Sequence, residues 1–231
     1  MANGAAERRE TQDKLDVGRQ RQWFDRLIQL SDGVFAIAIT LLAFDLHGPR
    51  VWDGGLASLW ADLAPKLDAY ALSFVVISVY WLAHRRFMAL VHTVDAPVSI
   101  LTLGMLALVA LLPAATQLAH SHGTLQATML VYGLLVVAIG LLLAAVWAYA
   151  ALIANLVSPE VTSSVRWFLL LLMVFTPPLF LGLIMALRTH IAGATPLALF
   201  ILFLIGWRMR MRTLRRLAKV RSASPAADAQ T

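Results

Sequence analysis

The sequence predicts an all-α membrane protein with six transmembrane helices per subunit. Of its 231 residues, 60% are hydrophobic and only 14% are charged, whereas a soluble domain carries about 25% charged residues. Apolar runs long enough to cross much of a bilayer recur along the whole chain. Lys and Arg residues also gather on alternate sides of these runs, as they do in multi-pass membrane proteins. Together these observations exclude a mainly soluble protein.

A polar N-terminal segment, a transmembrane domain and a basic tail follow one another along the chain. We expect residues 1–22 to be cytoplasmic and partly disordered, and residues 212–231 to form a disordered cytoplasmic tail. We expect residues 23–211 to form a transmembrane domain of six helices. Its expected spans are residues 23–46, 67–87, 97–119, 124–156, 164–187 and 194–211.

Three spans have individual features. The fourth is longer than a bilayer needs, so it is expected to tilt or to extend beyond the lipid. Pro113 lies late in the third span, and Pro177 and Pro178 are expected to break or bend the fifth. The Ser-Asp-Gly pattern of the first span occurs once, so any symmetric assembly requires several chains.

The distribution of positive charge sets the orientation. With six spans, 16 of the 19 Lys and Arg residues fall on one side of the membrane, and Arg50, Lys66 and Arg188 fall on the other. The positive-inside rule therefore places both termini of this multi-pass protein in the cytoplasm. Because this topology accounts for the net charge of +6, we expect no nucleic-acid partner. The basic stretch from Arg208 to Arg221 is expected to touch anionic headgroups of membrane lipids.

The first span carries both polar residues and an apolar stripe. At about 100° per residue, one stripe of the helix holds Arg26, Leu30, Gly33, Ile37, Leu41 and Phe44, with Thr40 on its flank. Ser31 and Asp32 fall on the opposite side. Charged groups inside a membrane helix are costly and are hypotheses for a functional site.

Asp32 needs a hydrogen-bond donor from another helix, because lipid offers none. Arg26 is six residues away and is badly placed within the same helix. The candidates on the second span are Tyr80, Trp81 and His84, at the same expected depth. We therefore expect a polar network that joins the first two spans near the cytoplasmic side.

The first span resembles a known family signature. Its Arg26-x-x-x-Leu30-Ser31-Asp32-Gly33, followed by VFAIAITLLAFDL, is similar to the first-helix motif of bacterial homologues of the endolysosomal potassium channel, transmembrane protein 175. The family pattern is Arg-x-x-x-Phe-Ser-Asp, so Leu30 stands where the family has Phe. The segment YALSFVVISVYWLAHRRF, residues 70–87, looks like the second helix of that family.

The resemblance implies a fold, an assembly and residue roles. It implies a homotetramer whose first helices line a central pore for potassium, without a carbonyl filter loop. Ile37 would form the narrow constriction, Leu41 and Phe44 further apolar rings, and Thr40 a ring of hydroxyls beside the ion. The residues expected to bind the helices together around the pore are Arg26, Ser31, Asp32, Trp81 and His84. At the cytoplasmic mouth, Arg26 should be neutralised by Asp25 or by an acid of another chain.

The main hypothesis is thus a potassium-selective, leak-like cation channel. The alternative is a proton-conducting channel or transporter that uses Asp32 and His84. We expect no enzyme and no cofactor, because the chain has no cysteine and no His-rich metal motif, and only Asp32 and Asp45 are candidate catalytic acids of the first span. His120 and His122 are expected to lie in a solvated external turn rather than to bind metal.

Overall fold

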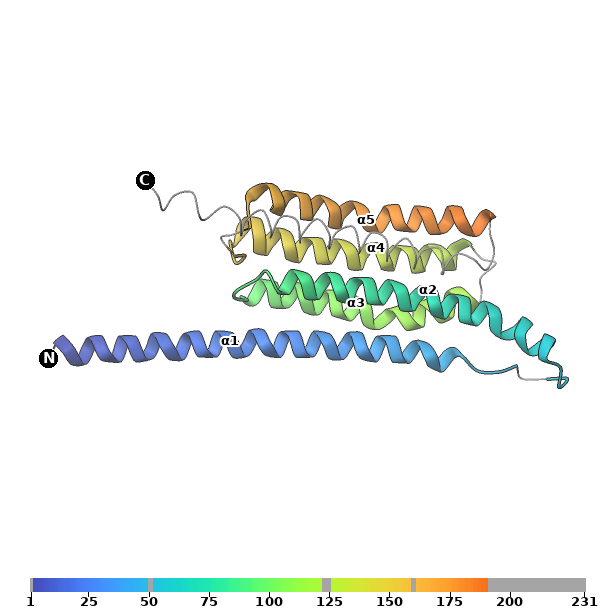
Figure 1. The fold of residues 1–231 in the computed structure, drawn as a ribbon, viewed down its shortest axis with the longest axis horizontal. Helices are drawn as coiled ribbons and strands as arrows, with labels where there is room; N and C mark the ends of the chain where they lie inside the picture. Colours follow the sequence, from blue (N-terminus) through green and yellow to red (C-terminus); the bar gives the residue numbers. More distant parts are fainter. Residues whose placement is uncertain (1, 50–51, 122–125, 159–160, 191–231) are drawn as a thin grey trace, which may run out of the picture.

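The computed structural model describes residues 2–49, 52–121, 126–158 and 161–190. Five long helices lie side by side along the long axis of the molecule, with α1 at one edge and α5 at the opposite edge (Figure 1). They are α1 (Ala2–Leu41), α2 (Leu56–Met88), α3 (Ala96–Ser121), α4 (Gln126–Ala148) and α5 (Ser163–His190). A 3₁₀ turn, Leu42–Asp45, extends α1, and a π-helical turn, Tyr149–Ile153, extends α4.

Four of these helical segments are long and apolar enough to cross a membrane. They are Gly18–Phe44, Leu56–Met88, Ala96–Ala119 and Ala127–Ile153, and Ser163–Leu179 is a shorter apolar segment of α5. The chain is therefore an all-α, multi-pass membrane protein. The expected sixth span, the basic tail and His122 lie outside the described residues.

The N-terminal segment corrects one expectation. Residues 1–22 were expected to be partly disordered, but α1 begins at Ala2 and continues without a break into the apolar span. Oppositely charged residues four apart, Arg9 with Asp13 and Glu10 with Lys14, favour a helix there. Because the apolar span is already helical, the extension also needs no new nucleation.

Other expected boundaries are extended or kept. The second helix starts at Leu56 rather than at residue 67, with Pro65 inside it. The third span matches α3 to within two residues, and the fourth matches α4 together with its π-helical turn, which ends at Ile153, to within three. Pro177 and Pro178 do not break α5, which runs through both.

A close approach between α4 and α5 accommodates the two prolines. A Cβ atom at Gly140 of α4 would collide with the ring of Pro177, so only glycine fits this position without a shift. The Thr176 hydroxyl also donates a hydrogen bond to the Leu172 carbonyl one turn earlier in α5. Neighbouring helices and Ser/Thr side chains of this kind make proline tolerable in membrane helices.

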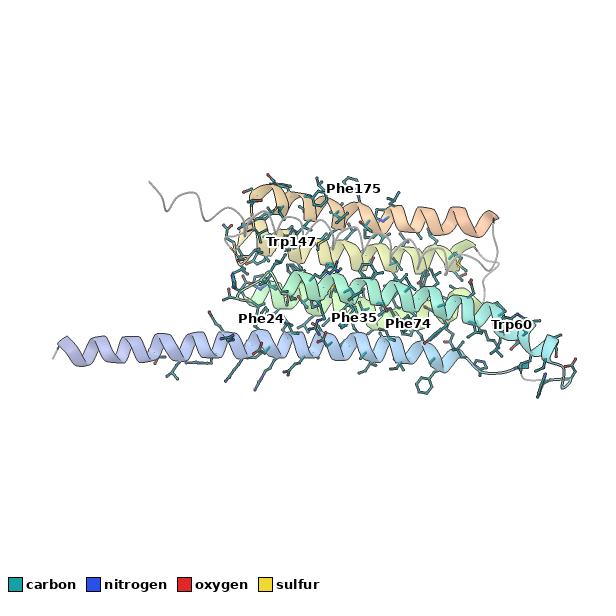
Figure 2. The ribbon with its side chains drawn as sticks, in the orientation of Figure 1. Phe24, Phe35, Trp60, Phe74, Trp147 and Phe175 are labelled. Carbon is teal, nitrogen blue, oxygen red and sulfur yellow. The ribbon has the colours of Figure 1, made fainter. Side chains whose placement is uncertain are left out.

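The core lies between α1, α2, α3 and α4. Phe35, Ile77, Met105, Ile139 and Trp147 are each at most 1% exposed. Phe35 of α1 and Trp147 of α4 point into the bundle from its two sides (Figure 2). The Trp147 ring meets Phe87 of α2 edge-on at a centroid distance of 5.3 Å.

Two loops at the same end of the bundle are joined to each other. The α2–α3 and α4–α5 loops exchange backbone hydrogen bonds, from His92 N to Leu156 O (3.0 Å) and from Ser158 N to Leu90 O (3.1 Å). Arg166 of α5 donates to the carbonyl of Ala151 at 2.7 Å, inside the π-helical turn, and to Asn155 Oδ1 at 2.8 Å. Both loops lie at the end of the bundle from which α1 projects (Figure 1).

The connection between α1 and α2 is held at the opposite end. Lys66 Nζ donates to the His47 carbonyl at 3.0 Å. Before α2 begins, Asp53 accepts hydrogen bonds from the Ser58 hydroxyl and from Gly55 N. Both hydrogen bonds lower the pKa of the Asp53 carboxyl, and the one from the Ser58 hydroxyl has the larger effect.

Candidate functional site: the outer face of the first helix

One face of α1 is buried against α2 and α3. Leu27, Phe35, Ala38 and Leu42 are between 1% and 8% exposed on this face, and Ser31 is fully buried among them. Phe35 packs against the imidazole of His84 at a centroid distance of 6.0 Å. Apolar packing therefore fixes which side of α1 turns away from the rest of the chain.

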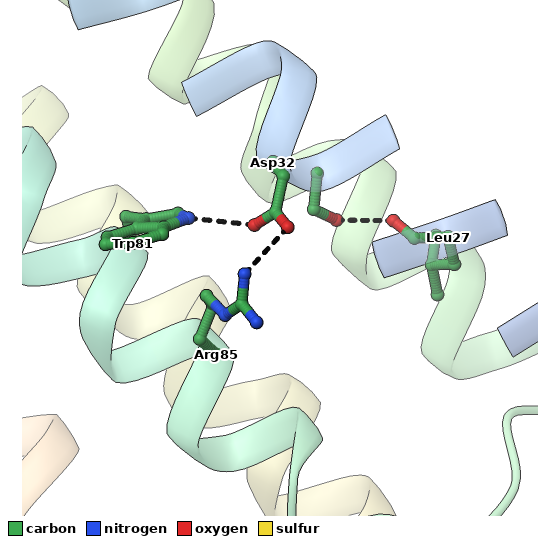
Figure 3. Close-up of polar contacts among 5 residues, drawn as sticks. Leu27, Asp32, Trp81 and Arg85 are labelled. Atoms are coloured by element: carbon green, nitrogen blue, oxygen red, sulfur yellow. Dashed lines mark hydrogen bonds and ion pairs between the residues drawn. The ribbon is translucent and has the colours of Figure 1, made fainter. Parts of the chain in front are cut away.

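Asp32 joins α1 to α2 through two donors on the same face of α2. Trp81 Nε1 donates to Asp32 Oδ1 at 2.8 Å, and Arg85 Nη1 contacts Asp32 Oδ2 at 3.0 Å (Figure 3). The Arg85 guanidinium also lies 5.6 Å from the centroid of the Trp81 ring, a cation–π distance. Each carboxylate oxygen thus has its own partner, and rotation of α1 about its axis would break both contacts.

Ser31 and Arg26 act differently from Asp32. The Ser31 hydroxyl donates a hydrogen bond to the Leu27 carbonyl of α1 at 2.7 Å. Its hydrogen-bonding capacity is therefore met within α1 and not by another helix. Arg26 is exposed and makes no ion pair with any residue that the structure describes, Asp25 included. The expected neutralisation of Arg26 by Asp25 does not occur within one chain, because Asp25 faces a different side of the helix.

Among the expected partners of Asp32, Trp81 is in contact with it and two others are not. The Tyr80 hydroxyl donates to the Val136 carbonyl of α4 at 2.6 Å. His84 is 1% exposed, and its Nε2 atom has no hydrogen-bond partner among the described residues. Tyr80 and His84 both lie on the buried face of α2, which points into the bundle.

The sequence analysis missed Arg85. It was counted only among the positive charges of the cytoplasmic side, although it lies within the expected second span, residues 67–87. Helical spacing could have identified Arg85 as a partner of Asp32, because residues four apart share a helix face and Trp81 lies four residues before Arg85.

The stripe opposite the buried face is open in the single chain. Leu30 is 49% exposed, Ile37 61%, Leu41 43% and Phe44 80%. Thr40 is also exposed, and its hydroxyl donates to the Ile37 carbonyl at 2.9 Å. Along the described part of α1, the stripe residues are thus exposed while Ser31 is buried, as the helical spacing predicts.

Helix α1 therefore combines a fixed inner face with an apolar outer face. An uncovered apolar face of a membrane helix contacts either lipid or further protein. Where several such helices surround an axis, their stripes would stack as apolar rings. Among the residues that the structure describes, no group of three or more His, Cys, Asp or Glu side chains could hold a metal ion. The fold and this helix define an all-helical, multi-pass membrane protein whose first two helices are joined by an ion pair.

Comparisons with known proteins identify its family. The family described as endosomal/lysosomal potassium channel TMEM175 matches residues 26–113, which include the outer stripe of α1, Asp32, Trp81 and Arg85. A potassium channel of Streptomyces collinus is 34% identical over 143 residues, 59% of this chain and 68% of that relative. The chain belongs to the TMEM175 family, a family of channels and not of enzymes.

Two further relatives extend the comparison. A potassium channel of Chamaesiphon minutus is 34% identical over 132 residues, which cover less than two thirds (65%) of that relative. The human endosomal/lysosomal proton channel TMEM175 is 24% identical over 154 residues, 64% of this chain and 30% of the human protein.

A solved structure shares the fold. The crystal structure of a lysosomal potassium-selective channel TMEM175 homolog from Chamaesiphon minutus superposes with a TM-score of 0.62 at 27% identity. The superposition covers 82% of this chain and 98% of the other. The arrangement of helices seen in Figure 1 is thus the family fold.

Proposed function

We propose that this protein is a potassium-selective, leak-like cation channel in which the α1 helices of four copies surround a central pore. The observation that carries the proposal is the outer stripe of α1, which is apolar, exposed in the single chain and held facing outward by Asp32. The relatives named potassium channels support the choice of ion.

Ile37 would form the narrowest ring of this pore, with Leu41 and Phe44 as further rings. A narrow apolar ring forces an ion to shed water and can close by dewetting. Potassium holds its hydration shell less tightly than sodium, so it crosses such a ring at lower cost. The Thr40 hydroxyls, one helical turn from the constriction, would replace part of the lost water.

The small residues beside the stripe suit an assembly of α1 helices. Ala36 and Ala43 are exposed on the side of α1 between the stripe and Asp32, about 100–120° from Ile37, and small side chains allow membrane helices to approach closely. At Gly33 an added Cβ atom would meet nothing within 4 Å in the single chain. The space around this part of α1 is therefore available to another copy.

The orientation proposed is with the projecting end of α1 in the cytoplasm, in the inner membrane of a bacterium. Arg85 in the last turn of α2 and Arg166 in the first turn of α5 belong to this end of the bundle, whereas Lys66 contacts the α1–α2 connection at the other end. The excess of Lys and Arg at one end is what the positive-inside rule assigns to the cytoplasm.

A proton pathway through Asp32 and His84 is the second candidate, and the human relative, which is named a proton channel, favours it. Within one chain, Asp32 is occupied by Trp81 and Arg85, and His84 is packed against Phe35 on the buried face. A proton route that joined the two side chains would require them to leave these contacts. We therefore favour the apolar stripe as the conduction pathway.

The test is ion flux in liposomes that contain the purified protein. A potassium gradient should drive dye-reported flux, and an equal sodium gradient should drive much less. Ile37→Asn should raise sodium flux toward that of potassium, because a polar ring no longer requires dehydration. Ile100→Asn is the matched control, since Ile100 of α3 is 67% exposed but lies on another helix, and it should leave the ratio unchanged.

Three results would contradict the proposal. They are the absence of potassium flux from folded, assembled protein, a selectivity change in Ile100→Asn equal to that in Ile37→Asn, and proton flux without potassium flux. Proton flux without potassium flux would favour the proton pathway instead if the proton flux is lost in the Asp32→Asn variant.

A further inference from the structure

His84 of α2 and Thr102 of α3 are polar side chains in the interior of the bundle whose hydrogen bonds are unaccounted for. His84 is 1% exposed and Thr102 is 0% exposed. Neither His84 Nε2 nor Thr102 Oγ1 has a hydrogen-bond partner among the described residues. Buried polar atoms in native proteins are nearly always paired, either with protein or with ordered water, because burial removes their contacts with bulk water. A partner for these two atoms is therefore expected.

A second polar cluster, farther along the interface of α2 and α3, sets the register of the two helices. The Ser73 hydroxyl of α2 lies 2.8 Å from the Thr116 hydroxyl of α3 and 3.1 Å from the Tyr132 hydroxyl of α4. The Thr116 hydroxyl donates its single proton to the Leu112 carbonyl at 2.8 Å, so it accepts from Ser73. Ser73 and Thr116 thus face each other directly across the interface.

Counting from this contact places His84 and Thr102 on the same facing sides of α2 and α3, which run side by side in opposite directions (Figure 1). At about 100° per residue, the step from Ser73 to His84 turns the side chain by only about 20°, and the step from Thr116 back to Thr102 by about 40°. At about 1.5 Å per residue, His84 lies roughly 17 Å and Thr102 roughly 21 Å along the helices from that contact. Both side chains therefore point into one interface, within about one helical turn of each other.

We propose that His84 and Thr102 form a binding site for one buried water molecule at the junction of α1, α2 and α3. A water bridge between two polar atoms spans about 5–6 Å, because each of its hydrogen bonds is about 2.8 Å long. This span matches an offset of about one helical turn, which is too long for a direct hydrogen bond. The site lies within one chain, so its test is separate from that of the proposed pore.

Water suits the two groups because it both donates and accepts hydrogen bonds. A neutral imidazole presents Nε2 as a donor or as an acceptor, and a threonine hydroxyl acts as either, so one water complements every combination. A divalent cation is a poorer occupant, since it requires several oxygen ligands, usually carboxylates among them. The carboxylate of Asp32, on the adjoining helix, already pairs with Trp81 and Arg85.

The bound water holds the His84 ring in place behind α1. Phe35 of α1 packs against this ring at a centroid distance of 6.0 Å and is itself 1% exposed. Phe35 belongs to the buried face of α1, on the side away from the outer stripe. The water site thus gives the orientation of α1 a second support, next to the contacts of Asp32.

The experiment detects water at His84 by solid-state NMR of the full chain in lipid bilayers, with isotope-labelled histidine. Magnetisation from water protons should reach the His84 imidazole nitrogens, whose signals are identified by their loss in His84→Gln. In Thr102→Val the transfer to His84 should fall to background, because the water loses one of its two partners. In Thr102→Ser, which keeps the hydroxyl, the transfer should persist.

Thr116→Val is the matched control. It removes a hydroxyl from the same face of α3, but one that already contacts Ser73 and Leu112, so the transfer to His84 should be unchanged. Thermal unfolding in detergent gives a second measurement. Thr102→Val should lower the melting temperature, because the buried Nε2 atom of His84 loses its water partner.

Two results would overturn the water site. One is the absence of water transfer to His84 in the unaltered protein. A raised melting temperature in Thr102→Val would then indicate a dry site, and a lowered one a direct hydrogen bond between His84 and Thr102. The other is transfer that persists at full strength in Thr102→Val, which would show that Thr102 is not a partner of the water.

Discussion

Asp32 is the residue that fixes the orientation of α1. Its two oxygens accept from Trp81 and Arg85 at the interface with α2 (Figure 3). Asn at this position would keep an acceptor for Trp81 and lose the ion pair, whereas Ala would lose both contacts.

Asp32→Ala should therefore lower the unfolding free energy by about 1.5–3 kcal/mol, and Asp32→Asn by less. Because the Asp32 side chain is 34% exposed, the lower end of this range is expected. Thermal unfolding in detergent measures both changes. Asp25→Asn, at an exposed position of the same helix, is the control, and equal effects at the two positions would contradict the role of Asp32.

Gly33 separates the fold of one subunit from the assembly of several. An added side chain at Gly33 meets open space within the chain, whereas one at Gly140 collides with Pro177. Gly33→Leu should leave the thermal stability of the subunit unchanged but reduce potassium flux by at least roughly tenfold, because four added side chains would narrow the pore.

Gly140→Ala should show the opposite pattern. It should lower the melting temperature, because α4 and α5 must move apart by part of a side-chain diameter. Undiminished flux in Gly33→Leu would show that this position does not face a pore.

The first helix shows which parts of the structure its sequence could predict. Helical spacing alone separates Ile37 and Leu41 from Ser31, and the structure confirms this, because spacing directly determines the face of a helix. The choice of partner for Asp32 was predictable only to within one segment of α2. Tyr80, Trp81 and His84 lie at the same depth, and side-chain direction and packing decided between them.

The N-terminal extension could not be predicted from composition. Residues 2–22 have few apolar side chains to bury, and composition of that kind is typical of disorder. The extension is helical because it continues a helix that the membrane segment already stabilises.

The junction of α4 and α5 depends on Arg166. This side chain binds the Ala151 carbonyl in the π-helical turn, Asn155 Oδ1 and the Val161 carbonyl. Asn155 has a positive φ of 50°, a conformation that such a turn requires.

Arg166→Ala should lower the unfolding free energy by about 2 kcal/mol, because several carbonyl acceptors lose a charged donor together. Urea or thermal unfolding in detergent checks this value. Asn155→Gly keeps the positive φ, which glycine adopts at no steric cost, and loses only the Oδ1 contact with Arg166, so it should cost less stability than Arg166→Ala. A loss of stability in Asn155→Gly as large as that in Arg166→Ala would show that the Asn155 contact, and not the carbonyl contacts of Arg166, maintains the junction.

At the scale of the whole molecule, the helix bundle turns one apolar face of α1 outward. The buried core lies on the other side of α1 and continues through α2, α3 and α4 (Figure 2). The described part of one chain therefore contains the wall of the proposed pore, with the stripe of α1 exposed on its outside. The family fold was predictable from the motif at Arg26 to Gly33, whereas the burial that leaves the stripe open required the structure.

The central claim is that the outer stripes of α1 from several copies meet on one axis. The chain has no cysteine, so a single introduced thiol reports its own neighbours without background. The most direct measurement is oxidative cross-linking of Ile37→Cys in native membranes, with Ile100→Cys as the equally exposed control. We expect disulfide-linked subunit pairs for Ile37→Cys and none for Ile100→Cys. Cross-linking at Ile100 but not at Ile37, in assembled protein, would contradict it.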